Sequence, residues 1–160
     1  MGGRTLPRQP LTFKECRRGL RSMSKSRDDA EALVRHWYQR FNDNDRAGML
    51  ALLAPGVAHD INQGGRETGV DAFKTFLERM DRCYRERVTG LVVMADAAGA
   101  RAAAEFTVHG SYIATDQGLP PASGQPYVLP AGAFFAVADG RITRVSTCYN
   151  LPEWIRMVGG

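Results

Sequence analysis

The sequence has few cysteines, no long apolar run and no internal repeat, and each absence narrows what the protein can be. Its 160 residues include three cysteines, Cys16, Cys83 and Cys148, which are odd in number and widely separated. This spacing predicts neither a disulfide framework nor a metal site and is typical of a reducing compartment, so we expect a cytoplasmic protein. No apolar run approaches the roughly 20 residues that a membrane helix needs, which predicts a soluble chain without a membrane partner.

The basic excess is confined to one end of the chain. Residues 1–27 hold eight Lys or Arg and one acid, whereas the remaining 133 residues hold 13 basic and 16 acidic side chains. We therefore expect no nucleic-acid partner, although the net charge of +4 alone would favour one. The 1–27 segment shows no sustained apolar period and is predicted to be a disordered tail. Three explanations for it stay open: translation upstream of a start at Met23, an Arg-rich transit peptide, or an anion-binding arm.

Residues 28–158 are predicted to form one α+β domain. Apolar residues at three- and four-residue spacing predict helices over about 28–42 and 70–84, with a shorter helix between them that ends at Pro55-Gly56. Strands are predicted over about 57–62, 88–95, 101–115, 131–138 and 142–150, and a closing helix over 151–158. Four prolines in residues 116–130 predict a long, stiff loop. Three helices ahead of a run of antiparallel strands favour helices packed on one face of a curved, mostly antiparallel sheet that encloses a pocket.

Several short stretches, in this order and spacing, resemble one known family. They include Phe41-Asn42-Asp43-Asn44-Asp45, Leu52-Leu53-Ala54-Pro55-Gly56-Val57, His59-Asp60-Ile61-Asn62-Gln63-Gly64, Arg82-Cys83-Tyr84-Arg85-Glu86, Ala104-Glu105-Phe106 with Gly110, and Phe134 through Ile142. Together they resemble the nuclear-transport-factor-2-like superfamily, which includes ketosteroid isomerase and the SnoaL-like polyketide cyclases. Within it, the chain is similar to the bacterial subgroup described as ketosteroid-isomerase-related. The resemblance implies a cone-like fold around a pocket for a small apolar molecule.

The resemblance also implies that the acids of both family chemistries are absent. Trp37 stands at the position of the isomerase's oxyanion tyrosine, and Ile61 stands at its general-base aspartate. Ala133, or Gly132, stands at the oxyanion-hole aspartate, which is also the position of the catalytic aspartate of the cyclases. Ketosteroid isomerisation needs a carboxylate base and an oxyanion hole made of a tyrosine and a protonated acid, so we do not expect that mechanism here.

Three residues remain as candidates for chemistry. His59 lies two residues before Ile61 and so on the same strand face, where a neutral imidazole could act as a general base or simply close the pocket rim. Asp60 falls on the opposite face, where a structural salt bridge, to Arg66 for example, competes with a catalytic role. Tyr149 is the candidate hydrogen-bond donor to an oxyanion. By the resemblance, the pocket walls comprise Trp37, Ile61, Phe106, Val108, Tyr112, Ala133, Phe135, Val145 and Thr147.

The other face of the long strand is polar and predicts a partner. Glu105, Thr107 and His109 alternate along it, and the resemblance implies that this outer face packs against a second copy of the chain. Two hypotheses for function stay open. One is an isomerase- or cyclase-type enzyme that needs no cofactor, and the other is a non-catalytic module that binds a hydrophobic ligand or serves as a dimeric scaffold.

Overall fold

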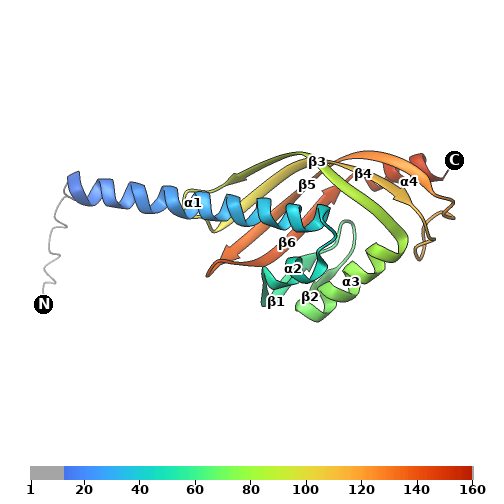
Figure 1. Ribbon diagram of the computed structural model, residues 1–160, viewed down its shortest axis with the longest axis horizontal. Helices are drawn as coiled ribbons and strands as arrows, with labels where there is room; N and C mark the ends of the chain where they lie inside the picture. Colours follow the sequence, from blue (N-terminus) through green and yellow to red (C-terminus); the bar gives the residue numbers. More distant parts are fainter. Residues whose placement is uncertain (1–12, 160) are drawn as a thin grey trace, which may run out of the picture.

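The structure, a computed structural model, describes residues 13–159, with only the backbone described for residues 13–25 (Figure 1). The elements in chain order are α1 (Phe13–Asn42), α2 (Arg46–Ala51), β1 (Leu53–Asp60), β2 (Arg66–Thr68), α3 (Val70–Cys83), β3 (Tyr84–Ala95), β4 (Arg101–Tyr112), β5 (Gln125–Ala138), β6 (Arg141–Tyr149) and α4 (Leu151–Val158).

The six strands form one curved sheet in the order β2-β1-β6-β5-β4-β3. Neighbouring strands are antiparallel except β1 and β6, which pair in parallel. The helix α1 lies along one face of the sheet, α2 and α3 follow beside it, and α4 closes the end near the C-terminus (Figure 1). This arrangement confirms the predicted α+β fold, with three N-terminal helices on a curved and mostly antiparallel sheet.

Strand alternation decides which side chains face the helices. Along β3, Tyr84 and Val88 are buried whereas Arg85 and Arg87 are exposed. The same alternation puts Phe106 inside on β4 and Phe134 outside on β5. The inner side chains pack against α1 and α3 in one apolar cluster, and a second cluster around Trp154 fills the end covered by α4.

Two local features fix strands of the sheet. The side-chain amide of Asn42, at the end of α1, donates to the carbonyl of Val88 (2.9 Å) and accepts from its N–H (2.8 Å). It thus satisfies backbone groups on β3, the edge strand, that would otherwise lack partners. Between the two central strands, β5 and β6, Asp139 and Gly140 both have positive φ (51° and 70°), as a two-residue turn requires.

Several predicted boundaries were wrong. The second helix ends at Ala51 and β1 begins at Leu53, so Pro55 and Gly56 lie inside a strand and do not end the helix. The first helix starts at Phe13 and not near residue 28, so part of the segment predicted to be disordered is helical, while residues 1–12 lie outside the described residues. Residues 13–27 contain no proline and are rich in good helix formers. Likewise, the predicted loop 116–130 ends early, because β5 begins at Gln125. Its prolines, Pro126 and Pro130, pair only with β4, since pairing with β6 starts at Ala131, and a missing N–H is tolerated where one side of a strand is free.

None of the helices in the described part of the chain is long and apolar enough to cross a membrane. The short strand β2 was not predicted, because its exposed residues, Arg66–Thr68, carry no apolar pattern.

Candidate active site

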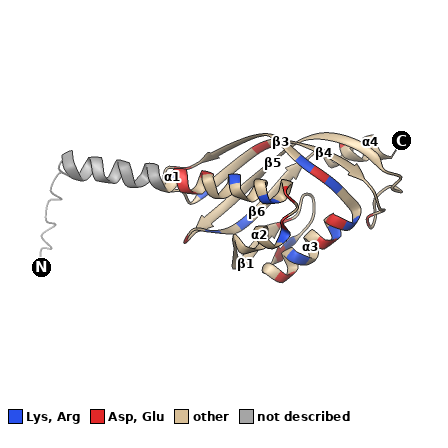
Figure 2. Ribbon diagram, in the orientation of Figure 1, with Lys and Arg blue, Asp and Glu red and all other residues tan. Residues whose placement is uncertain are grey.

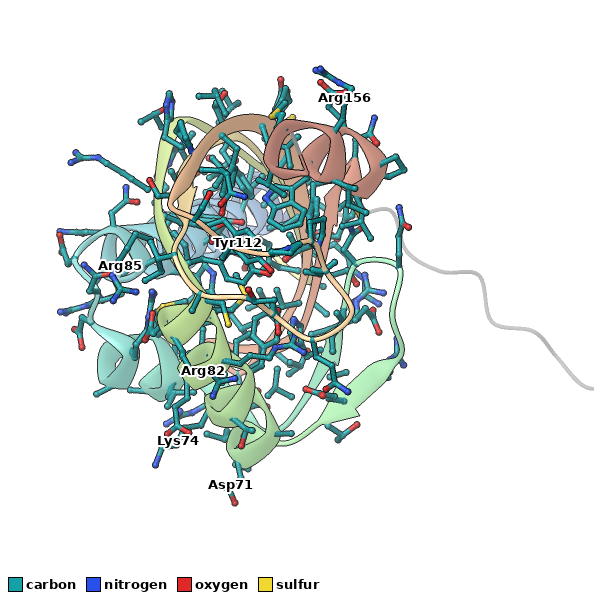
Figure 3. The ribbon with its side chains drawn as sticks, turned by 90° about the vertical axis from the view of Figure 1, so that its right-hand side faces the viewer. Asp71, Lys74, Arg82, Arg85, Tyr112 and Arg156 are labelled. Carbon is teal, nitrogen blue, oxygen red and sulfur yellow. The ribbon has the colours of Figure 1, made fainter. Side chains whose placement is uncertain are left out.

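An inner cavity of about 310 Å³ lies between the helices and the inner face of the sheet. Its walls are mostly apolar and aromatic, which is typical of a site for a small organic molecule. Figure 3 looks into the end of the molecule beside this cavity: Tyr112 lies in the interior, whereas Asp71, Lys74 and Arg82 of α3 point outward.

Most of the predicted pocket residues line this cavity. The members of the predicted set found on its walls are Trp37, His59, Ile61, Phe106, Val108, Val145, Thr147 and Tyr149. Tyr112, Ala133 and Phe135 are buried but do not line it. The ring of Tyr112 stacks on that of Tyr84 (centroids 5.3 Å apart), and Phe135 packs against Tyr38, so both rings belong to the packed core.

His59 is buried in an aromatic setting, with 3% of its surface exposed. Its ring centroid lies 4.4 Å from those of both Phe73 and Phe76 on α3. Burial lowers the pKa of His59 below its usual value, and the ring is therefore neutral near pH 7. Its Nδ1 is buried without a hydrogen-bond partner among the described residues, which costs about 1–3 kcal/mol unless a ligand or water supplies one.

Asp60 points to the other side of β1, as its position next to His59 predicted. Its carboxylate accepts hydrogen bonds from Arg66 (2.6 Å) and from the hydroxyl of Ser146 (2.5 Å). The hydrogen bond from Arg66, followed by that from Ser146, lowers the pKa of Asp60 to about 2. Asp60 is not among the residues that line the cavity, and its geometry is that of a structural ion pair.

Glu86 is a cavity residue that the sequence analysis missed. It shares the inner face of β3 with Tyr84 and Val88 and lines the cavity. Its Oε1 accepts a hydrogen bond from the hydroxyl of Tyr127 (2.5 Å), and burial raises the pKa of its carboxyl group. The positive charge of Arg46 acts in the opposite direction and lowers this pKa, but Arg46 is itself bound to Asp81 through three hydrogen bonds.

A glycine makes the contact between Glu86 and Tyr127 possible. Gly110 of β4 pairs with Glu86 on one side and with Tyr127 on the other, so the three residues form one row across three strands. A Cβ atom at Gly110 would lie 2.5 Å from both Cε2 and the hydroxyl oxygen of Tyr127, and closer still to its Cζ. The tyrosine ring therefore crosses the strand over Gly110, where any other residue would place its side chain.

A second carboxylate, Asp116, lies at the cavity wall in the loop between β4 and β5. It is 7% exposed and accepts a hydrogen bond from the hydroxyl of Tyr84 (3.0 Å). Nε of Arg79 lies 3.9 Å from it and has no hydrogen-bond partner among the described residues. This end of the cavity therefore holds both charge signs, at the contact of α3 with the loop.

Tyr84, Tyr127 and Tyr149 bring neutral hydroxyl groups to the same end of the cavity. Burial is the largest cause that raises the pKa of each, and nearby carboxylates raise it further. These hydroxyls stay protonated at neutral pH. Those of Tyr84 and Tyr127 already donate to Asp116 and Glu86, which leaves the hydroxyl of Tyr149 as the donor for a ligand. In addition, the side chain of Asn62 donates to the backbone carbonyl of Tyr149 (3.1 Å), which holds the end of β6 beside the loop after β1.

Sequence signals for the two missed carboxylates differ. Glu86 lies among Arg82, Arg85 and Arg87, so its neighbourhood predicted a solvated surface, although alternation with Tyr84 would have pointed it inward. Asp116 lies in an irregular loop, and no periodic pattern could have placed it in the cavity.

The structure offers two further observations on alternative sites. Among the described residues, no three His, Cys, Asp or Glu side chains are grouped so that they could hold a metal ion. A more open hollow of about 590 Å³ lies between α1 and the turns after β3 and β5, and no predicted site residue lines it. The inner cavity is therefore the candidate site.

Comparisons with known proteins agree with this fold. The family model described as "SnoaL-like domain" matches residues 34–145. A crystal structure of a proposed polyketide cyclase from Pseudomonas putida is 56% identical, with 81% of this chain and 97% of that chain covered and a TM-score of 0.80. One from Silicibacter sp. is 43% identical, with coverages of 88% and 98% and a TM-score of 0.79.

More distant structures share the fold alone. A nuclear-transport-factor-2-like protein of unknown function from Burkholderia pseudomallei is 20% identical, with 82% of this chain and 98% of that chain covered and a TM-score of 0.71. No curated protein matches the sequence.

Proposed function

The chain belongs to the SnoaL-like domain family, and from that premise we propose that it is an isomerase- or cyclase-type enzyme acting on a compact, largely apolar substrate in the inner cavity. The observation that carries the proposal is His59, a neutral and buried imidazole on the cavity wall whose Nδ1 has no hydrogen-bond partner among the described residues. In the tautomer that carries its proton on Nε2, such a group can accept a proton at Nδ1, because no described residue donates a hydrogen bond to that atom.

In this proposal the protein moves a proton and leaves the oxidation state of the substrate unchanged, so no cofactor is needed. His59 removes a proton from a carbon next to a carbonyl group. Tyr149 and the indole N–H of Trp37, both on the cavity wall, are the donors proposed for the oxygen that gains negative charge. The aromatic walls exclude water, which strengthens these hydrogen bonds.

A second candidate function is a non-catalytic module that binds a hydrophobic molecule. The observation in its favour is that Ile61 and Ala133 stand where the resemblance predicts carboxylates. Ile61 lines the cavity but cannot transfer a proton, and Ala133 is buried and does not line the cavity.

Deuterium exchange into a simple ketone separates these functions without knowledge of the natural substrate. The full-length protein is incubated in heavy water with β-tetralone, a bicyclic ketone with acidic hydrogens, and NMR follows their replacement by deuterium. We expect wild-type protein to accelerate exchange and His59→Gln to reduce the acceleration by about 100-fold or more. His36→Gln, a change at a half-buried histidine of α1 that does not line the inner cavity, controls for the loss of a histidine.

Each outcome bears on the proposal. Exchange that His59→Gln leaves intact would contradict the assigned base. Binding of β-tetralone to the wild type, seen as a thermal shift, without any exchange would favour the non-catalytic module.

We also propose that a second copy of the chain covers the outer face of the sheet, which carries the predicted interface residues Glu105, Thr107 and His109. Met94 and Phe134 lie in one row across this face, and each is 52% exposed. Large apolar side chains grouped on an open sheet face favour burial against a partner. Charged residues gather on α3 and on the adjoining start of β3, whereas the strands β4 to β6 carry few (Figure 2).

The oligomeric state tests the proposed interface. Light scattering after size-exclusion chromatography should give a dimer for wild-type protein and a monomer for Phe134→Glu. Ile155→Glu, at an exposed apolar residue of α4, is the control and should stay dimeric. A wild-type monomer would contradict the proposal.

A further inference from the structure

The carboxyl group of Glu86 has the surroundings of a proton carrier and not of a structural ion pair. Among the described residues it forms no salt bridge, and its single hydrogen-bond partner is the neutral hydroxyl of Tyr127. Arg46, the one cation that acts on it, is occupied by Asp81. A buried carboxyl group without a counterion favours its neutral, protonated form.

The location of Glu86 relative to His59 matters as much as its charge. His59 is on β1 and Glu86 is on β3, which are near opposite edges of the sheet, yet the curvature brings both to the walls of one cavity. A substrate in that cavity can therefore contact both a proton acceptor and a proton donor. One is a neutral imidazole that accepts a proton, and the other is a carboxylic acid that donates one.

We propose that Glu86 is the second proton-transfer residue of the site, an acid that protonates the carbonyl oxygen of the substrate, with Tyr127 as its positioning residue and Gly110 as the gap that lets Tyr127 reach it. This inference rests on the function proposed above and makes the substrate class specific: an apolar carbonyl compound with an acidic C–H bond on the side of the carbonyl group that faces His59.

The proton-transfer step balances without any additional reactant. His59 takes the proton from the carbon next to the carbonyl group, and the electrons of that C–H bond form the carbon–carbon double bond of an enol. The carbonyl oxygen takes the proton of Glu86, which leaves a carboxylate and an imidazolium. In a substrate with a double bond conjugated to the enol, the imidazolium returns its proton to the far carbon of that system while the Glu86 carboxylate takes back the enol proton, which gives an isomer. Attack of the enol carbon on a second carbonyl group gives a ring when the oxygen of that group takes the imidazolium proton and the carboxylate takes back the enol proton.

Gly110 and Tyr127 give Glu86 its defined position. The hydroxyl of Tyr127 fixes Oε1, and no hydrogen bond from a described residue reaches Oε2, so that oxygen is available to a ligand. The ring of Tyr127 is itself held edge-on by Trp154 of α4, with centroids 5.8 Å apart. The contacts that position the Glu86 carboxyl group therefore come from Tyr127 and, behind it, α4, and not from α3.

The first test reads the proton on Glu86 directly in the ligand-free protein. Carbon-13 NMR of the glutamate carboxyl groups is recorded as a function of pH, and Glu86→Gln identifies the signal that disappears. We expect that signal to titrate above the usual glutamate range. It should titrate higher still in Tyr127→Phe, because the hydroxyl of Tyr127 stabilises the carboxylate form.

The titration must be interpreted with the groups that surround Glu86. These are Tyr127 from β5, Arg46 from α2 and, more distant at the same end of the cavity, Tyr149 from β6. The tyrosines stay neutral through the glutamate range, so the signal reports Glu86 itself. A Glu86 carboxyl group that titrates normally would overturn the inference, whether or not any ketone is turned over.

The second test uses the exchange of β-tetralone. We expect Glu86→Gln to lower the maximal rate of exchange by about 100-fold with a smaller effect on KM, since the acid acts in the transition state. Glu78→Gln, at an exposed carboxylate of α3, is the matched control. Exchange that depends on His59 but is unchanged in Glu86→Gln would overturn the role of Glu86 and leave the proposed function standing.

Discussion

Replacing Gly110 by alanine tests the packing that brings Tyr127 to Glu86. Gly110 is not at a positive φ, so its backbone conformation suits alanine, and in an open strand the change would stabilise the protein by up to about 1 kcal/mol. Here the new methyl group would lie 2.5 Å from the hydroxyl oxygen of Tyr127 and closer to its ring. The ring must move, and it then loses the hydrogen bond to the buried Glu86.

The expected magnitude follows from these opposing effects. Overpacking costs about 1–3 kcal/mol. The lost hydrogen bond costs about 1 kcal/mol more. The replacement of glycine by alanine offsets up to about 1 kcal/mol of this cost, because it restricts the unfolded chain. We therefore expect Gly110→Ala to reduce the free energy of unfolding by about 1–3 kcal/mol, or the melting temperature by about 2–12 °C.

Urea denaturation of five proteins measures this effect and its cause: wild type, Gly110→Ala, Gly56→Ala, Tyr127→Leu and the double variant. Gly56→Ala is the control, because no atom lies within 4 Å of a Cβ at that strand position. In a Tyr127→Leu background the clash is removed, and Gly110→Ala should become neutral or stabilising. If Gly110→Ala destabilises wild type and Tyr127→Leu protein equally, the assigned contact between Gly110 and Tyr127 is wrong.

Three further predictions concern pH. Burial lowers the pKa of His59, so as the pH falls through about 6.5 the imidazole is protonated in the unfolded chain before it is protonated in the folded protein. Wild-type protein should therefore lose stability relative to His59→Gln between pH 7.5 and 5.5, which thermal melts measure. Burial raises the pKa of Glu86, so its favourable contribution is lost as the pH rises above about 4.5, and Glu86→Gln should gain stability relative to wild type from pH 4.5 to 8. Asp60 has its pKa lowered to about 2, so the stability it contributes is lost as the pH falls from about 4 towards 2. Asp60→Asn should cost at most about 1 kcal/mol at pH 7, since Arg66 is mostly exposed, and should leave ketone exchange unchanged; a large loss of exchange would contradict its structural assignment.

The fold could be predicted from the sequence because its helices and most strands carry clear periodicity. The pattern of Phe73, Phe76 and Leu77 marks α3, and Asp139-Gly140 marks the final hairpin. The start of β5 could not be predicted, because Pro126 and Pro130 argue against a strand unless it is known that only one side of that segment is paired.

The candidate site was predictable only where alternation along one strand sufficed. His59 and Asp60 are separated correctly onto two faces by that rule. Phe135 shows its limit, since it faces inward as expected but lies in the core, because the depth of the cavity depends on how far the sheet curves. Glu86 shows a second limit. Alternation with Tyr84 points it inward, but its contact with Tyr127 depends on pairing among three strands that no local pattern reveals.

The pH dependence of β-tetralone exchange tests the central claim, proton removal by His59, most directly. The proposed function predicts that the rate for wild-type protein falls only at pH values below the ordinary imidazole value of about 6.5, because burial lowers the pKa of His59, and that His59→Gln lacks both the acceleration and this dependence. An accelerated rate with the same pH profile in both proteins would contradict it.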